Sequence, residues 1–156
     1  MFSLAYSEGN MLAFTGGYSA ALSPFGRAGS YSVFSQGRWS NIRETEFDDI
    51  SDGLIIEGET FLASAGDGIL QSGTNGTIIF NEENSPLTAD NTGQVLVTDL
   101  NAVENTLYAV NHNSPAPLLR FNGGEWESIP GIPPIGRYAV EVEPVRQVAW
   151  LRILRS

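Results

Sequence analysis

The chain has 156 residues, 42% of them hydrophobic and only 17% charged, and its 18 acidic and 8 basic residues give a net charge of −10. This hydrophobic content is sufficient for a folded core. Every basic residue is an arginine, and none forms the basic patch that nucleic acids or anionic membrane surfaces require. The absence of cysteine excludes disulfides, thiolate metal sites and cysteine nucleophiles. No apolar run approaches the ~18 residues of a membrane span.

The first predicted unit begins with an apolar segment, a short polar turn and a second strand, over Leu4–Gly16. Two further strands follow at 31–36 and 38–42, joined at Gly37. The second unit repeats this order, with a hairpin over Leu54–Gly66 and strands at 68–71 and 77–81. The glycines and the Asn75-Gly76 pair accept the positive φ of tight hairpin turns.

The third unit has the same organisation, with a hairpin over Val97–Val110 and strands at 117–122 and 125–129 around Gly123-Gly124. A fourth hairpin, Val140–Leu154, follows without outer strands. The four hairpins begin at residues 4, 54, 97 and 140, so they lie 50, 43 and 43 residues apart. Four short strands in every ~40 to 50 residues are typical of a propeller blade.

We therefore expect an all-β chain: a β-propeller segment of about three and a half four-stranded antiparallel blades. The chain is predicted to be part of one propeller domain, with blades near 4–42, 47–81, 95–130 and a partial blade at 138–154. Strands are expected near 10–18, 54–65, 105–112 and 147–153. Further blades of a larger parent protein would close the ring, and a β-sandwich is the alternative fold. The uncovered end faces are expected around Leu4, Leu12 and Phe14, and around Val148, Trp150 and Leu151.

The sequence predicts no catalytic, cofactor-binding or metal-binding residue. His112 is the single histidine, and no G-x-S-x-G motif accompanies it, so we interpret it as a polar residue where a strand meets a loop. The segment Phe47–Gly53 (FDDISDG) matches a calcium loop incompletely, and we interpret it as the start of a strand followed by an Asp-Gly turn. Asp67-Gly68 and Asp90–Gly93 are read as turns. A pair of carboxylates that cleaves glycosides stays an open alternative, because the distance between two acidic side chains depends on the fold.

The glycine-rich pairs Gly16-Gly17 and Gly66–Gly68 lack the helix and lysine of a phosphate loop. Trp39 and Trp126 are expected at equivalent positions of an outermost strand, together with Ile78, and Trp150 near the position of Tyr108. Aromatic residues that recur with a repeat usually pack between blades. Arg120 and Arg137 are expected on the solvated surface.

The run from Phe61 to Leu87 (FLASAGDGIL–QSGTNGTIIFNEENSPL) resembles the blades of bacterial two-component-regulator propellers, with Asn84–Leu87 as the linking tetrapeptide. Within that group the chain resembles the N-terminal propeller of PorZ-type proteins of the type IX secretion system of Bacteroidota. Phe47–Ile50, Asn84–Leu87 and Gly124–Trp126 carry the resemblance, which covers residues 30–151. The pattern Leu-Trp-Ile-Gly-Thr, which is typical of the sensor propellers of this group, is poorly preserved in this sequence.

The resemblance implies a non-enzymatic cell-surface component that takes part in protein secretion and surface anchoring through anionic lipopolysaccharide. It implies remaining propeller blades, sortase components of the secretion system or a surface glycan as partners, and it transfers no catalytic residue. No signal peptide is expected within Met1–Leu4, which lacks a charged region and a long apolar stretch. The alternatives are the sensing ectodomain of a hybrid two-component regulator and a carbohydrate-active propeller enzyme.

Overall fold

The computed structural model describes residues 3–112, 114–132, 137–143 and 148–154, with side chains described as far as residue 132. These residues form fourteen strands and no helix. The strands are arranged in three four-stranded antiparallel sheets and one two-stranded hairpin. The expectation of an all-β chain is therefore confirmed, and no helix interrupts the described residues between 54 and 130.

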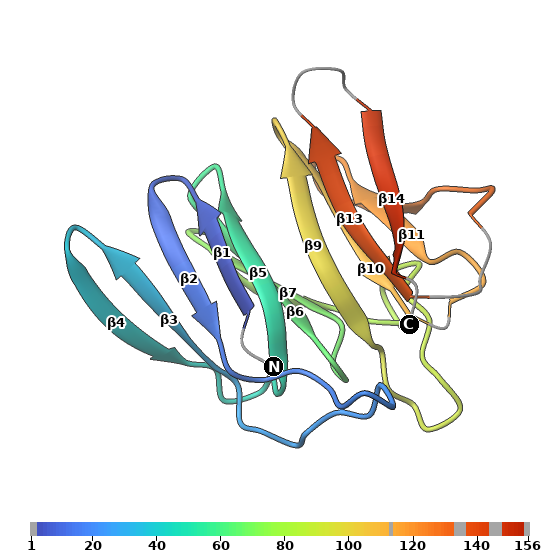
Figure 1. Cartoon of the computed structure of the whole chain (residues 1–156), viewed down its shortest axis with the longest axis horizontal. Coiled ribbons are helices and arrows are strands. Elements are labelled where there is room, and N and C mark those ends of the chain that lie inside the picture. Colours follow the sequence, from blue (N-terminus) through green and yellow to red (C-terminus); the bar gives the residue numbers. More distant parts are fainter. Residues whose placement is uncertain (1–2, 113, 133–136, 144–147, 155–156) are drawn as a thin grey trace.

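Each sheet consists of strands that are consecutive in the sequence and pair with their neighbours (Figure 1). The first sheet contains β1 (Ser3–Ser7), β2 (Asn10–Phe14), β3 (Ser30–Ser35) and β4 (Arg38–Arg43). The second sheet contains β5 (Ile50–Ile56), β6 (Glu59–Ser64), β7 (Ile69–Gly73) and β8 (Gly76–Phe80). The third sheet contains β9 (Val97–Val103), β10 (Thr106–Asn111), β11 (Leu118–Phe121) and β12 (Trp126–Ser128). The hairpin is formed by β13 (Arg137–Glu143) and β14 (Val148–Leu154).

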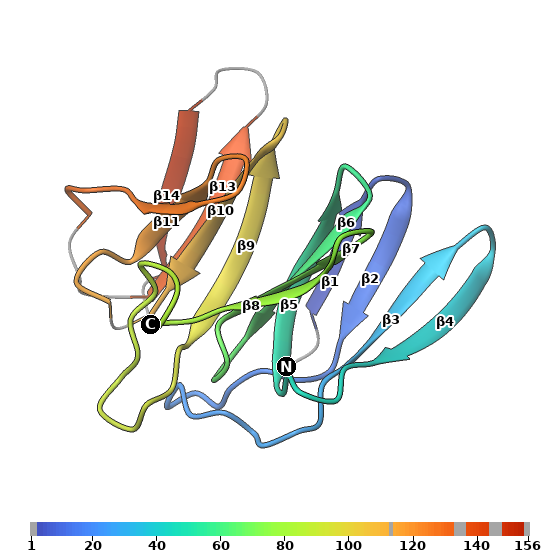
Figure 2. The ribbon, with the colours of Figure 1, turned by 180° about the vertical axis from the view of Figure 1, so that it is seen from behind.

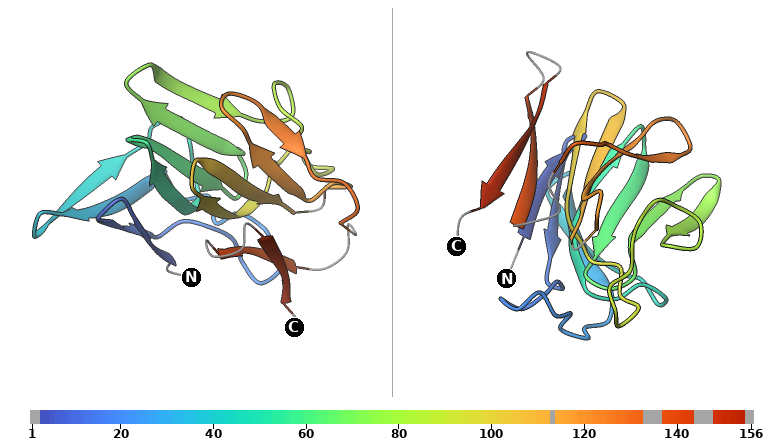
Figure 3. Two further views of the ribbon diagram at one scale, coloured as in Figure 1. Left: turned by 90° about the horizontal axis from the view of Figure 1, so that it is seen from above. Right: turned by 90° about the vertical axis from the view of Figure 1, so that its right-hand side faces the viewer.

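The first strands of the sheets lie beside one another in sequence order. β1 lies against β5, β5 against β9, and β9 against β13, as seen from the front and the back (Figures 1 and 2). From above, the outer strands β4, β8 and β12 lead away from these first strands (Figure 3, left). The middle sheet is consequently covered on both faces, by the first sheet on one side and by the third on the other.

Two separate cores hold the sheets together, and β6 contributes to both. Leu62 packs into a core with Leu12 and Phe14 of the first sheet. Its neighbour Phe61 packs into the core shared with Phe121 and other residues of the third sheet. Successive residues of a strand point to opposite faces, so β6 has apolar residues on both faces. Full burial of such a side chain contributes about 1.5–3 kcal/mol.

Side chains also satisfy the unpaired edges of the first strands. The Ser7 hydroxyl donates to the carbonyl oxygen of Ile55 and accepts from the Ile55 amide, at 3.1 Å for the latter. The Asp52 carboxylate accepts from the Leu100 amide at 2.9 Å. Both links connect residues 48 positions apart. β1 and β5 therefore each bind the edge of the following first strand through a side chain, so the backbone edges of adjacent sheets are linked without direct strand pairing.

Several details differ from the sequence-based expectations. The strand expected at 10–18 ends at Phe14, because Gly16 lies directly against the backbone of Asp49 and Ile50. Leu4 is exposed as expected, but Leu12 and Phe14 are almost completely buried, with 0% and 1% exposure. Both point toward the second sheet rather than outward. The expected exposure of the side chains of Val148, Trp150 and Leu151 lies outside the described residues.

Candidate binding groove

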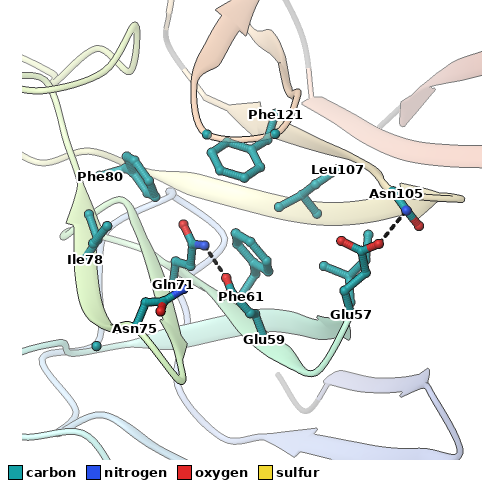
Figure 4. A pocket seen from close by; sticks show the side chains of 14 residues that line it. Glu57, Glu59, Phe61, Gln71, Asn75, Ile78, Phe80, Asn105, Leu107 and Phe121 are labelled. Carbon is teal, nitrogen blue, oxygen red and sulfur yellow. Dashed lines mark hydrogen bonds between the residues drawn. The ribbon is translucent and has the colours of Figure 1, made fainter.

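A groove of about 450 Å³ lies between the second and third sheets, next to their hairpin turns. Strands β5 to β8 form one wall, and β10 and β11 with the turns around them form the other (Figure 4). The lining residues are Ile56, Glu57, Glu59, Phe61, Gln71, Asn75, Gly76, Ile78, Phe80, Asn105, Leu107, Phe121, Gly123 and Gly124.

The floor of the groove is an aromatic cluster. The ring of Phe121 lies edge-to-face against Phe61 and Phe80, with centroid distances of 5.6 and 5.8 Å. Behind them Trp126 lies 5.2 Å from Phe121 and 6.2 Å from Phe80. Such edge-to-face pairs contribute about 0.5–1.5 kcal/mol beyond their burial. All three phenylalanine rings are almost completely buried, so the floor is apolar but exposes little ring surface.

The rim of the groove is acidic. The Glu57 carboxylate accepts a hydrogen bond from the Asn105 side chain at 2.5 Å, and Glu59 accepts one from Gln71 (Figure 4). A side chain at position 73 would collide with Glu59, because a Cβ there would lie 2.8 Å from its Cγ. Gly73 thus leaves the space that Glu59 occupies. Both carboxylates are held in place by neutral amides.

The turn that carries Glu57 is fixed by the first sheet. Glu57 and Gly58 have φ values of 53° and 76°, as in the tight turns that suit β-hairpins. The Glu8 carboxylate, in the preceding hairpin turn, accepts from the amides of Glu57 and Gly58 at 2.5 and 3.2 Å. Glu57 in turn reaches Asn105 in the following hairpin turn. The three turns therefore form a chain of carboxylate contacts that positions the rim.

A second, smaller pocket of about 120 Å³ lies between β5 and β9 and contains a carboxyl pair. Burial raises the pKa of the Asp52 carboxyl above its ordinary value, although hydrogen bonds from the Leu100 amide and the Asp99 carboxyl oppose this shift. The buried hydroxyl of Thr98, which also lines the pocket, has no hydrogen-bond partner. The fold thus brings together one carboxyl pair that the sequence did not single out.

The outward face of the first sheet presents an aromatic row. Tyr6 pairs with Met11, Met11 with Phe34, and Phe34 with Trp39, so all four side chains lie on one face. Tyr6 is 77% exposed and Trp39 is 52% exposed. We refer to Tyr6, Met11, Phe34 and Trp39 as the outer row.

The third sheet has a matching row that is covered by the second sheet. Its members, paired in the same order across the strands, are Ala102, Leu107, Phe121 and Trp126. The ring centroids of Phe34 and Trp39 are 5.2 Å apart at 48°, and those of Phe121 and Trp126 are 5.2 Å apart at 45°. Trp126 is only 6% exposed. The same cross-strand aromatic pair is therefore buried in one sheet and uncovered in the other.

The acidic motif around β5 has a structural role. The buried Asp49 carboxylate accepts from the amides of Gly26 and Arg27 at 2.6 and 3.1 Å, which fixes the loop between β2 and β3. The prediction of an Asp-Gly turn at residues 52 and 53 is wrong, since both lie inside β5. Glycine is required at 53 because a Cβ there would come within 2.7 Å of the Phe61 carbonyl oxygen. The prediction of a turn at Asp90–Gly93 is confirmed by the hydrogen bonds of the Asp90 carboxylate to the Thr92 and Gln94 amides.

Other sequence candidates lie outside the groove. His112 directly follows β10, where its amide donates to the Leu96 carbonyl at 2.8 Å, as expected for a strand that meets a loop. The amides of Gly66 and Asp67 donate to the Ser64 hydroxyl at 3.0 Å each, so this glycine-rich segment is a side-chain-capped turn. Asn84 caps the end of β8 through Asn81 and Ile79.

The tryptophan and arginine predictions are confirmed only in part. Trp39 and Trp126 are equivalent, but Ile78 is offset by one residue, since Thr77 occupies the matching register position. Ile78 therefore faces the groove. Arg120 is exposed and pairs with Glu127 at 2.9 Å. The side chains of Arg137 and Trp150 lie outside the described residues.

No cluster of three or more histidine, cysteine, aspartate or glutamate side chains suited to a metal ion occurs in the described part of the chain. Within the same residues there is no helix of the length and hydrophobicity needed to cross a membrane. The groove was not predicted from the sequence. The available signal was the recurrence of Glu8, Glu57 and Glu104 in the first hairpin turn of each unit.

In comparisons with known proteins, no protein-family model matches the chain and no curated protein is significantly similar to it. The assignment of a function therefore rests on the residues and geometry described above.

Proposed function

We propose that the three sheets are successive blades of a β-propeller and that the chain is a non-enzymatic binding and scaffold segment. The support is the order of the first strands, the stacking of each sheet on the next, and the repeated edge contacts of Ser7 with Ile55 and Asp52 with Leu100. Propellers stack four-stranded sheets around an axis in this way. The fold offers two surfaces for binding, which are the groove and the outer row.

The observation that carries this proposal is the uncovered outer row. In the second and third sheets, the face that corresponds to the outer row is covered by the preceding sheet. In the first sheet the same face presents Tyr6 and Trp39 to solvent. A further four-stranded sheet therefore belongs on this face, and the partners include remaining blades of a longer parent protein.

We propose a cell-surface role in protein secretion and surface anchoring, as in PorZ-type proteins, on the basis of the motif order noted above. The motif residues are used structurally. Phe47 and Leu87 are buried, and Asp49 fixes a loop. With a net charge of −10, this segment is poorly suited to an anionic glycolipid. Anionic lipopolysaccharide would contact other parts of the parent protein.

This role can be tested with the full-length protein in its native bacterium. An epitope placed in the β3–β4 turn at Gln36-Gly37 should be cleaved by protease added to intact cells. Deletion of the gene should release proteins that are normally anchored to the surface into the medium. An epitope that resists external protease, with anchoring unchanged in the deletion strain, would refute the proposed location and role.

The enzyme alternative has one specific site, the Asp52 and Asp99 pair. We propose that this pair is structural, because Asp52 binds the Leu100 amide and its pocket is small. The full-length protein should leave a panel of bacterial polysaccharides intact. Polysaccharide cleavage that disappears in Asp52→Asn and Asp99→Asn variants would instead assign an enzyme. The full-length gene product distinguishes the sensor alternative from the proposed role. A membrane span followed by a kinase domain would favour the sensor.

A further inference from the structure

The groove has the chemistry of a site for a positively charged group. Its described lining contains two carboxylates, Glu57 and Glu59, and no basic residue. A third carboxylate, that of Glu8 in the preceding hairpin turn, accepts hydrogen bonds from the amides of Glu57 and Gly58. The hydrogen bonds from Asn105 and Gln71 orient the two lining carboxylates without neutralising them. Each carboxylate oxygen can accept more than one hydrogen bond, so both retain capacity for a ligand.

The apolar part of the groove favours a slender aliphatic body. Leu107 and Phe121 form one wall, and Ile78, which is 51% exposed, stands at the opening on the other. Phe61, Phe80 and Phe121 are each less than 10% exposed and pack edge-to-face. A sugar ring requires an open aromatic face for stacking, and these rings offer none. A methylene chain needs only apolar contact.

The groove lining combines apolar side chains with carboxylates at close quarters. In Figure 4 Phe121 and Leu107 lie on one wall, and Phe61 lies on the other between Glu57 and the Glu59–Gln71 pair. A side chain with an aliphatic stem and a cationic head matches this combination. The net charge of −10 adds a long-range attraction for basic partners and a repulsion for acidic ones.

We infer that the groove receives a lysine or arginine side chain of a partner polypeptide. The stem lies between Leu107 and Ile78, and the head donates hydrogen bonds to Glu57 and Glu59. The inference rests on the proposed function, because it names the partner chemistry of a binding segment. Arginine fits both carboxylates best, since its planar head donates to two acceptors at once.

The test uses the 156-residue chain labelled with ¹⁵N and blocked pentapeptides of sequence Gly-Leu-X-Leu-Gly, with arginine, lysine, citrulline or glutamate at X. The amide signals of Gly123, Gly124 and the Asn105 side chain report on the groove. We expect the arginine peptide to shift these signals with at least about tenfold higher affinity than citrulline, which keeps the shape but lacks the charge. The glutamate peptide should not bind. Raising the salt concentration should weaken binding of the arginine peptide.

Matched variants identify the contacts. Glu57→Gln with Glu59→Gln should remove the preference for arginine over citrulline. Glu83→Gln, which changes an exposed acid in the turn that follows β8, should retain it. Both glutamines keep an acceptor for Asn105 and Gln71, so the fold is preserved. Equal binding of arginine and citrulline peptides would overturn the inference, as would groove shifts caused by chitotriose but by none of the peptides. The proposed cell-surface role fails separately, through the protease and anchoring assays on intact cells.

Discussion

Gly68 and Gly37 both have a positive φ, at 91° and 78°, but only Gly68 lies against another strand. A Cβ at position 68 would come within 2.1 Å of the Phe80 carbonyl oxygen, whereas at position 37 it would meet nothing within 4 Å. The first glycine is required by both conformation and space, and the second by conformation alone. Sequence patterns predict the conformational requirement but not the steric one.

Replacing Gly68 with alanine should therefore destabilise the chain more than replacing Gly37. We expect a loss of about 1–2 kcal/mol for Gly37→Ala, which is the cost of a left-handed non-glycine residue. For Gly68→Ala we expect about 2–5 kcal/mol, because overpacking against the β8 backbone is added. Urea unfolding of the two variants and the parent chain measures the difference. Equal losses would show that β8 moves away from Gly68 at no cost.

The Asp52 carboxyl makes stability depend on pH. Burial raises its pKa above the ordinary value of 3.8, so the folded state holds the proton more tightly than the unfolded state does. The stabilisation is fully present below pH 3.8 and is lost as the pH rises through the raised pKa. Asparagine keeps an acceptor for the Leu100 amide and carries no charge. Asp52→Asn should therefore increase the free energy of unfolding at pH 7, and this gain should shrink as the medium is acidified.

Asp90 provides the control with the opposite sign. Hydrogen bonds from Thr92 and Gln94 lower the pKa of its carboxyl. The contribution of Asp90 to stability is present above the ordinary pKa of an aspartate and is lost as the pH falls through the lowered pKa of the folded state. Asp90→Asn should thus reduce stability at pH 7 and have less effect in acid. Denaturant titrations at several pH values distinguish the two substitutions, and a loss of stability at pH 7 for Asp52→Asn would contradict the assigned burial effect.

At the scale of the strand, residues on one face pack against a neighbouring sheet, and residues on the outward face of the first sheet contact solvent. Leu62 is 0% exposed and joins the core between the first and second sheets, whereas Leu4 is 68% exposed on the outward face. We expect Leu62→Ala to cost about 2–5 kcal/mol through lost burial and the remaining cavity. Leu4→Ala should stay within about 0.5 kcal/mol. Thermal unfolding of both variants checks this contrast, and a large loss from Leu4→Ala would mean that the outward face is covered.

The sequence predicted the four-strand grouping because turn chemistry is local. Asn75-Gly76 and Gly123-Gly124 mark hairpins wherever the sheets lie. The same local reasoning failed at Asp52-Gly53, which looks like a turn but is held in β5 by contacts with Phe61 of the neighbouring strand. It also placed Ile78 at the position equivalent to Trp39 and Trp126, because Gly76 looks like part of the turn, whereas it is the first residue of β8 and pairs with Gly73.

The groove and the outer row could not be predicted from the sequence because both depend on how whole sheets are placed. Phe121 and Glu57 are 64 residues apart and meet only where the second and third sheets diverge from each other. Exposure of the outer row likewise follows from the lack of a covering sheet within the described residues, since the equivalent Phe121 and Trp126 are buried. The alternation of side chains along a strand shows that the sheet has two faces, but it does not show which face another sheet covers.

At the scale of the whole molecule, the outer row should cause association of the isolated chain. Exposed apolar patches larger than a few hundred Å² are uncommon on soluble monomers. Tyr6 and Trp39 should bind the same face or other apolar surfaces of neighbouring chains. We expect sedimentation velocity to show oligomers that increase with concentration. Substituting both residues with serine should shift the distribution toward monomer with little change in unfolding temperature, because both are more than half exposed.

A matched control separates this effect from general hydrophobicity. Phe25 and Ile78 are also exposed, at 40% and 51%, but they lie outside the outer row. Replacing both with serine should leave association unchanged. If the parent chain sediments as a monomer at every accessible concentration, the outer row is not an adhesive face, and the proposal that a further sheet covers it loses its main support. If the control variant dissociates the oligomers instead, association depends on Phe25 or Ile78 rather than on the outer row.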